Sequence, residues 1–183
     1  MNHNSDASDK HTVYEGKYLR LCKQAHWEFA ERTNAGSAVI IIAKTPDEKL
    51  LFVEQLRIPL GANTIEMPAG LVGDTDANDT LELAAKRELL EETGWLAESV
   101  EVLMIGPTSS GLSNELIAFV RATNLTRINS GGGDDTENIT VHEVPVVDAP
   151  KWLSQKMAEG YAMDPKLWAG LWLLDKNPDG SAA

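Results

Sequence analysis

Three glutamates close together carry the strongest chemical signal in the chain. Glu88, Glu91 and Glu92 stand at positions i, i+3 and i+4, so a helix would place their carboxylates side by side. Like charges repel, and the repulsion grows where a packed surface lowers the effective dielectric constant. A divalent cation bound between the carboxylates turns this repulsion into attraction. Oxygen ligands suit Mg²⁺ or Mn²⁺, and substrate phosphates often complete the coordination shell of such an ion. The spacing indicates a metal site; a solvated acidic surface is the alternative.

The residues around these glutamates predict one helix with both ends marked. Asp79 is a suitable N-cap, and Glu82 three residues later completes a capping-box pattern. Gly94 stands where a left-handed residue commonly ends a helix, and the interior consists almost entirely of strong helix formers. Glu88 and Glu92 continue a face that begins with apolar residues, so we expect their carboxylates at the edge of a packed core.

The flanking segments extend this signal into a motif. Met67-Pro68-Ala69-Gly70 precedes a loop, and Arg87-Glu88-Leu89-Leu90-Glu91-Glu92-Thr93-Gly94-Trp95 ends the helix. Together they resemble the signature of the Nudix hydrolases, a glycine, loop and helix that end in Arg-Glu-(apolar)-x-Glu-Glu-x-Gly-(apolar). The loop departs from the family pattern. Counted from Gly70 it has three extra residues, and counted from Gly73 the spacing fits but Asp79 replaces the first glutamate.

The resemblance covers about residues 13–174 and implies a fold. It implies an α/β/α sandwich with a mixed central β-sheet, the glutamate helix against that sheet, and an N-terminal antiparallel hairpin. We expect a disordered leader at 1–12, N-terminal strands at 13–35, a Nudix domain at 36–175 and a tail at 176–183. The resemblance also implies a homodimer built through the N-terminal strands.

Hydropathy along the chain predicts the individual elements. Two alternating runs between Val13 and Phe29 are consistent with a hairpin that breaks at Gly16. Further apolar runs predict strands at 38–43, 50–55, 64–67, 100–105, 116–120 and 139–144, and helices at 149–159 and 164–174. The tryptophans of these last two helices, Trp152, Trp168 and Trp172, are expected to anchor the core rather than to stack on a ligand.

The resemblance implies a catalytic and metal-binding set. Its members are the carbonyl of Ala69 and the side chains of Glu88, Glu91, Glu92, Asp135 and Glu137. Glu88, Glu92 and Glu137 would hold Mg²⁺, or alternatively Mn²⁺, with Ala69. Glu91 would add a ligand or position water, and Glu137 or Asp135 would act as general base. Arg87 is interpreted as structural, pairing with the neighbouring carboxylates.

Four segments N-terminal to the glutamate helix, at 14–18, 27–32, 53–59 and 65–70, resemble those of the branch of the family that cleaves ADP-ribose and nucleoside diphosphate sugars. The substrate contacts that this implies are Tyr18, Trp27, Arg32, Arg57, Glu66, Ser110 and Glu115. Tyr18 and Trp27 would stack on the base, although packing within a strand is as good a role for Tyr18. Arg32 and Arg57 would bind the diphosphate or the terminal ribose, since a guanidinium binds phosphate in a bidentate manner; a surface ion pair is the alternative for Arg32.

Glu66, Glu115 and Ser110 complete this set. Glu66 would orient a substrate hydroxyl or an arginine, and Glu115 is a further acidic candidate near the site. Members most closely tied to ADP-ribose carry a proline sixteen residues after the closing glycine, where this chain has Ser110. Proline fixes φ and lacks an N–H donor, so the serine favours a wider set of nucleoside diphosphate sugars.

Composition narrows the function classes. The 183 residues suit one domain with a sizeable core. A net charge of −12 argues against nucleic acid or an anionic membrane as partner. The single cysteine, Cys22, excludes an intrachain disulfide and a cysteine-based zinc site. No apolar run approaches 18 residues and the N-terminus is polar, so a cytoplasmic location is expected.

The expected activity is metal-dependent hydrolysis of nucleoside diphosphate sugars such as ADP-ribose, ADP-glucose or GDP-mannose. Water would attack one phosphorus, and the products would be a nucleoside monophosphate and a sugar phosphate. The alternatives are a strict ADP-ribose pyrophosphatase, a dinucleoside polyphosphate or coenzyme hydrolase, a non-catalytic nucleotide-sugar sensor and an acidic structural module. The intact set of glutamates favours an enzyme over a sensor.

Overall fold

A computed structural model describes residues 9–74, 78–133 and 138–183 of the chain. Two four-stranded sheets form its body. One has the order β7 (Ala69–Val72), β4 (Ser37–Ala43), β9 (Leu116–Arg127) and β8 (Trp95–Pro107). The other has the order β10 (Thr140–Pro145), β5 (Lys49–Arg57), β6 (Ala62–Glu66) and β11 (Ala162–Met163). Each sheet contains one parallel pair, β4 with β9 and β6 with β11, so both are mixed.

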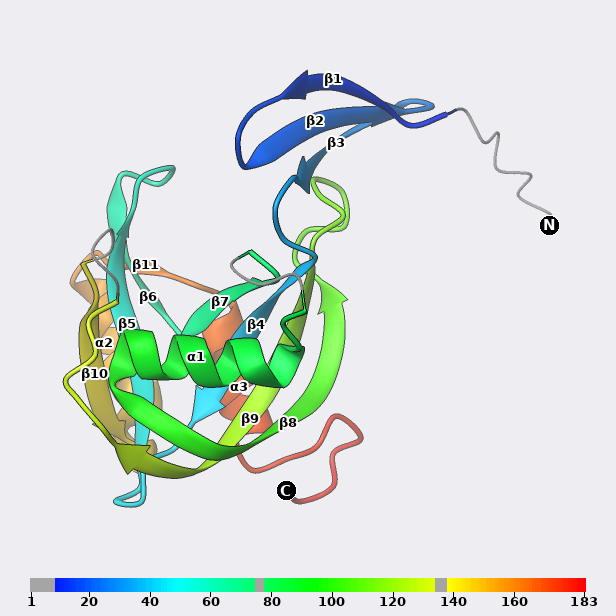
Figure 1. Cartoon of the computed structure of the whole chain (residues 1–183). Coiled ribbons are helices and arrows are strands. Elements are labelled where there is room, and N and C mark those ends of the chain that lie inside the picture. Colours follow the sequence, from blue (N-terminus) through cyan, green and yellow to red (C-terminus); the bar gives the residue numbers. More distant parts are fainter. Residues whose placement is uncertain (1–8, 75–77, 134–137) are drawn as a thin grey trace.

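Strand β4 shows how the sequence builds three layers. Its run of β-branched residues is buried on both faces, as the absence of alternation predicts. Val39 and Ile41 belong to the core cluster beneath α1 (Leu81–Thr93), whereas Ile40 and Ile42 belong to the cluster with α2 (Ala149–Ala158) and α3 (Lys166–Leu173). Figure 1 shows α1 on one side of the strands and α2 and α3 on the other. The α/β/α sandwich predicted from the sequence is therefore confirmed.

Helix α1 begins one residue later than the capping pattern predicts. The N-cap is Thr80, whose side chain accepts a hydrogen bond from the Leu83 backbone N–H. The assignment of Asp79 as the cap is wrong, because the Asp79 carboxylate is engaged by Arg87 instead, at 3.3 Å. The predicted end is correct: Gly94 adopts a left-handed conformation with φ +75°, and its N–H donates to the Leu90 carbonyl.

The N-terminal strands form a separate antiparallel sheet. The predicted pairing is present, and it includes three strands rather than two: β1 (His11–Glu15), β2 (Leu19–Gln24) and β3 (Trp27–Arg32). This N-terminal sheet stands away from the body in Figure 1. β1 begins at His11, inside the predicted leader, and residues 1–8 of that leader lie outside the described residues.

A backbone group and a side chain of β3 hold the N-terminal sheet to the loop between β8 and β9. The Ala30 N–H donates to the Leu112 carbonyl at 2.8 Å, and the Asn114 side chain donates to Glu31 at 2.7 Å. Glu31 is 8% exposed and is also bound by Lys10 at 2.7 Å and by Arg20. A buried carboxylate therefore connects this sheet with the body.

The three tryptophans near the C-terminus differ in their packing. Trp152 stacks on Phe52 with ring centroids 5.3 Å apart, as a core anchor should. Trp168 and Trp172 are each 45% exposed, so the prediction that they anchor the core is wrong. α3 turns Leu167, Gly170 and Leu173 inward instead. None of the helices in the described ranges is long and apolar enough to cross a membrane.

The left-handed end of α1 generates a prediction on stability. A Cβ atom at Gly94 would lie 2.2 Å from the Asn129 carbonyl oxygen, in a backbone conformation that L-residues rarely adopt. We expect Gly94→Ala to destabilise the fold by about 2 kcal/mol or more, measured by urea denaturation. Gly111→Ala is the control, because that position is open and has ordinary φ. Equal stability of the two variants would contradict the steric explanation.

Candidate active site

One cavity of about 410 Å³ lies between α1, the ends of the sheets and the start of α3. Seven of the residues predicted for the site line it: Arg32, Arg57, Glu66, Ala69, Glu88, Glu92 and Glu115. These residues come from six different elements or loops of the chain. The fold therefore brings together a set that is scattered over more than 80 positions in the sequence.

Glu92 connects α1 with the Pro-Ala-Gly turn. Its side chain is buried, with the residue 3% exposed, and its Oε2 accepts a hydrogen bond from the Ala69 N–H at 3.0 Å. A carboxylate bound to a backbone N–H is held more firmly than one bound only by water. Glu92 thereby fixes the distance between the helix and the first residue of β7.

Glu88 lies directly against the backbone of β7. A Cβ atom at Gly70 would be only 2.0 Å from the Glu88 Cδ, so a glycine is required for this close approach. Burial raises the pKa of the Glu88 carboxyl to about 7; the adjacent Arg87 opposes that rise and the charge of Glu91 adds to it. An ionised Glu88 is therefore costly in this position unless a cation compensates its charge.

Arg87 pairs with the carboxylates around it. Its guanidinium donates to Glu88 Oε1 at 2.8 Å and to the Leu71 carbonyl at 3.2 Å, and it pairs with Asp79. Arg87 does not line the cavity in the described part of the chain, which agrees with the structural role predicted for it. Glu91 is likewise not among the residues that line the cavity; its side chain is 48% exposed and lies 3.5 Å from Arg87.

The opposite wall carries a bidentate ion pair. Arg57 Nε and Nη2 each donate to a carboxylate oxygen of Glu66 at 2.7 Å, across the paired strands β5 and β6. Glu66 is 8% exposed and also accepts from the Thr64 hydroxyl at 2.5 Å. Burial alone would raise the pKa of Glu66, but the bonds from Arg57 and Thr64 outweigh burial and lower it. Glu66 therefore orients an arginine, one of its two predicted roles.

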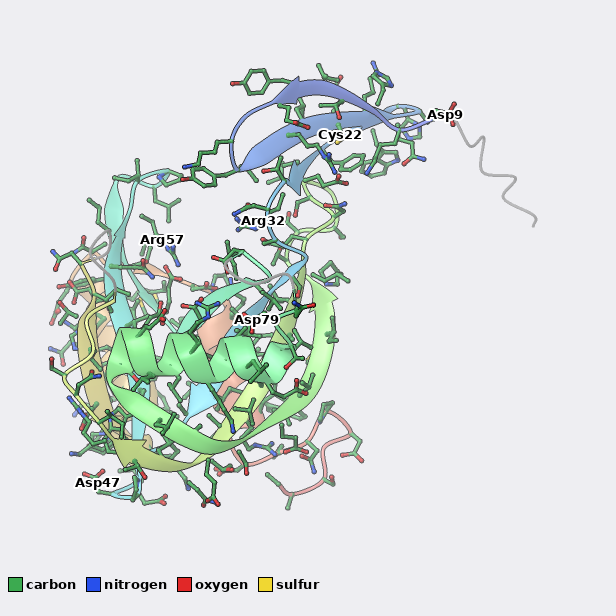
Figure 2. All side chains as sticks on the ribbon, in the orientation of Figure 1. Asp9, Cys22, Arg32, Asp47, Arg57 and Asp79 are labelled. Atoms are coloured by element: carbon green, nitrogen blue, oxygen red, sulfur yellow. The ribbon has the colours of Figure 1, made fainter. Side chains whose placement is uncertain are left out.

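A second arginine faces this pair from the N-terminal sheet. Arg32, the last residue of β3, donates through Nε to the Glu115 carboxylate. Figure 2 shows Arg32 and Arg57 on opposite sides of the space above α1. Both guanidinium groups are thus held by carboxylates while their side chains remain about one third or more exposed, at 32% and 43%.

Several predicted site residues lie elsewhere. Tyr18 and Trp27 are 55% and 53% exposed on the N-terminal sheet, and neither lines the cavity of this single chain. Ser110 is exposed in the loop between β8 and β9 and does not line it either. Asp135 and Glu137 lie outside the described residues. Within the described ranges no group of three or more His, Cys, Asp or Glu residues is placed to hold a metal ion.

The structure adds residues that the motif does not contain. Gln55, Asp74, Thr108, Asp164 and Lys166 also line the cavity. Lys166 Nζ lies 2.6 Å from Asp164 Oδ2. In the sequence these two residues are an ordinary Asp-Pro-Lys start of a helix, a pattern that is common on protein surfaces. Their place in the cavity depends on the pairing of β11 with β6, which local sequence does not specify.

The burial of Glu88 generates a prediction on pH dependence. Its pKa in the folded protein, about 7, is above the unfolded value of 4.5. The metal-free fold therefore loses stability as pH rises from 4.5 to 7 and keeps that loss at higher pH. We expect Glu88→Gln to raise the melting temperature at pH 8 in EDTA by roughly 5 °C, from a gain on the order of 2 kcal/mol, with no gain at pH 4.

The control for this prediction is Glu82→Gln, on the exposed face of the same helix. It should not raise the melting temperature at either pH; a loss of up to about 3 °C at pH 8 is expected because a first-turn carboxylate interacts with the helix dipole. A Glu88→Gln protein that is less stable than the wild type at pH 8 would show that the ionised carboxylate is well compensated in the metal-free state.

Comparison with known proteins agrees with this geometry. The family model described as NUDIX domain matches residues 34–163. An ADP-ribose pyrophosphatase of Bacillus subtilis is 32% identical over 65% of this chain and 63% of its own length. A methanol dehydrogenase activator of Bacillus methanolicus is 34% identical with the same coverage. The chain thus aligns with less than two thirds of the length of these two relatives.

Another relative is named for a broader class of substrates. An ADP-sugar pyrophosphatase of Mus musculus is 31% identical over 69% of this chain and 62% of its own length. Among solved structures, an ADP compounds hydrolase superposes with a TM-score of 0.64 at 19% identity, covering 83% of this chain and 92% of its own. The superposition supports the fold. Because the family model matches residues 34–163, more than half of this chain, the chain belongs to the Nudix family.

Proposed function

We propose that the protein is a metal-dependent pyrophosphatase that hydrolyses nucleoside diphosphate sugars to a nucleoside monophosphate and a sugar phosphate. The observation that carries this proposal is the cavity that holds the carboxylates of Glu88 and Glu92 together with two carboxylate-anchored arginines. Carboxylates that can hold a metal ion and guanidinium groups that can bind phosphate oxygens, in one cavity, suit a metal-bound diphosphate. Relatives named ADP-ribose pyrophosphatase and ADP-sugar pyrophosphatase support the substrate class.

The residues present fit a divalent cation. Glu88 and Glu92 offer carboxylate oxygens in one cavity. Burial raises the pKa of Glu88 to about 7, so a bound cation would favour its ionised form. These two side chains and the Ala69 carbonyl would hold Mg²⁺ or Mn²⁺, with Glu137 as a further proposed ligand. When bound, the metal neutralises phosphoryl charge and lowers the pKa of a bound water.

The chain's own groups bind and orient the substrate. Arg57 and Arg32 bind phosphate oxygens or ribose hydroxyls from opposite sides, and Glu66 and Glu115 hold each guanidinium in a fixed direction. Water forms a bond to one phosphorus, the bridging P–O bond breaks, and a carboxylate accepts the proton of the water. Glu137 or Asp135 is the proposed base, and Glu91 the proposed water-positioning residue.

The proposed substrate range is broad. Ser110 lies in an exposed loop, and a serine at this position does not fix φ as a proline would. We therefore propose cleavage of ADP-ribose, ADP-glucose and GDP-mannose rather than of one of them alone. A strict ADP-ribose pyrophosphatase, a dinucleoside polyphosphate or coenzyme hydrolase, and a non-catalytic sensor are the outcomes that the test below separates. The cytoplasmic location and the lack of nucleic-acid or membrane partners stay predictions.

The proposed function is tested by a Mg²⁺-dependent hydrolysis panel with products identified by mass. The substrates are ADP-ribose, ADP-glucose, GDP-mannose, UDP-glucose and a dinucleoside tetraphosphate. We expect turnover of several sugar nucleotides, and a Glu92→Gln variant should lose about 100-fold or more in kcat/KM because a buried metal ligand is lost. Glu82→Gln is the matched control. A Glu92→Gln enzyme with wild-type activity would contradict the assignment of Glu92 as a metal ligand. No turnover of any substrate with metal bound would indicate a sensor.

The N-terminal sheet supports a proposal on assembly. Tyr14, Tyr18 and Trp27 expose 69%, 55% and 53% of their surface on a sheet that stands away from the body. We propose that a second copy of the chain covers these side chains in a homodimer, where Tyr18 and Trp27 reach the partner's substrate. Such apolar exposure is costly in water for an isolated chain.

Light scattering on the full chain checks this proposal. We expect the mass of a dimer for the wild type, and a monomer when residues 1–32 are deleted. Trp27→Ala should raise KM without changing the mass if the indole stacks on substrate. A monomeric wild-type chain would overturn the proposed homodimer.

A further inference from the structure

Two side-chain pairs join the end of β3 to the loop between β8 and β9. Asn114 Nδ2 donates to Glu31 Oε2 at 2.7 Å, and Arg32 Nε donates to the carboxylate of Glu115. The partners are consecutive residues on both sides of this contact, which Figure 2 shows in the region of Arg32, between the N-terminal sheet and the body. Arg32 and Glu115 line the candidate active site, whereas Glu31 and Asn114 are not among its lining residues.

The backbone beside these pairs is parallel and in register. The Ala30 N–H donates to the Leu112 carbonyl at 2.8 Å, and Ala30 forms a parallel bridge with Ser113. Successive side chains of a strand point to opposite faces, so a shift of one residue would turn Arg32 away from the cavity. The register of β3 on the loop therefore decides whether the Arg32 guanidinium faces the candidate active site.

Glu31 is bonded at both of its carboxylate oxygens. Lys10 Nζ donates to Oε2 at 2.7 Å, Arg20 Nε donates to Oε1 at 2.7 Å, and Asn114 is the donor from the loop. The Lys10 ammonium holds the pKa of this carboxyl below its usual value, and the bonds from Arg20 and Asn114 lower it further, against the opposing effect of burial. Two cations of the N-terminal segment thus fix an ionised acceptor, to which the loop donates.

Arg32 is not enclosed by packed side chains. A smaller cavity of about 210 Å³ lies between the loop and the linker after β3, and Arg32 lines this cavity as well as the candidate active site. Its side chain is 32% exposed. The direction of the guanidinium therefore depends on polar bonds and on the backbone register more than on apolar contacts.

We propose that Glu31 and Asn114 are positioning residues for Arg32: their bond fixes the register of β3 on the loop and so directs the Arg32 guanidinium toward the substrate. Glu31 and Asn114 act through Arg32 and do not touch the substrate themselves. This inference rests on the proposed function, because it deepens the role of Arg32 in the same site. A purely structural role would lower the melting temperature without an effect on substrate affinity that depends on Arg32.

Steady-state kinetics of the full chain with ADP-ribose and Mg²⁺ test the proposal. Asn114→Ala should raise KM about fivefold to tenfold, through the loss of one hydrogen bond to a charged group, and change kcat less than about twofold. In an Arg32→Ala background the same change should alter KM less than about twofold, because effects that pass through one contact are not additive. Asn63→Ala is the control, since Asn63 also donates to a glutamate, Glu54, at 3.0 Å and does not line the cavity.

A second variant separates the lost hydrogen bond from the lost volume. Asn114→Asp keeps the shape of the side chain, removes the N–H donor and places a like charge beside Glu31. It should raise KM at least as much as Asn114→Ala does. The inference is overturned if KM is unchanged in both variants, or if Asn114→Ala raises KM equally in the wild type and in the Arg32→Ala background.

Solvent exchange of the Arg32 Nε–H, followed by NMR with isotope-labelled arginine, reports the positioning without any substrate. We expect Asn114→Ala to speed this exchange about fivefold or more, because the bond from Arg32 to Glu115 opens more often, and Asn63→Ala to leave it unchanged. Unchanged exchange in Asn114→Ala overturns the inference whether or not the protein is an enzyme. A wild type that hydrolyses none of the sugar nucleotides, with exchange that responds as expected, contradicts the proposed function and supports the positioning of Arg32.

Discussion

The close contact between α1 and β7 is the constraint on which the rest of the site depends. Glu88 lies against the backbone at Gly70, where no Cβ could be accommodated, and Glu92 accepts the N–H of Ala69. Both carboxylates therefore face the cavity from within the packed structure instead of from a solvated helix surface. A buried ionised carboxylate lowers the stability of the empty protein, and this cost is what makes the position suited to a cation. The Arg87 network limits the cost without removing the charge.

The layered fold explains why the remaining side chains meet these carboxylates. β4 is buried on both faces, so α1 covers one side while α2 and α3 cover the other. The cavity lies at the ends of the strands, where β3, β5 and β6 each end in a charged residue: Arg32, Arg57 and Glu66. Each cation of the wall is anchored by a carboxylate, so its direction is set before any ligand binds, and less side-chain freedom is lost on binding.

Much of this arrangement follows from local sequence, and some of it does not. The helix formers and Gly94 predict α1, and the unbroken apolar run at 38–43 predicts β4. The predicted N-cap, Asp79, is one residue before the observed one, Thr80. Both residue types are suitable caps, and only the tertiary contact of Asp79 with Arg87 decides between them. Local sequence does not predict that Lys166 lines the cavity, because the parallel pairing of β11 with β6 joins positions about 100 residues apart. Exposure of Trp168 and Trp172 depends on which face α3 turns inward, and its short apolar sequence fits either choice.

The position of Arg32 has a mechanical consequence. This residue ends β3, and so it belongs to the N-terminal sheet while its guanidinium lines a cavity of the body. The N-terminal sheet contacts the body through the loop at residues 108–115, at Leu112, Asn114 and Glu115. A displacement of the sheet together with this loop would carry Arg32 and its partner Glu115 toward or away from Arg57. The width of the cavity is therefore not a property of the sandwich alone, and whatever fixes the N-terminal sheet also sets the spacing of the two arginines.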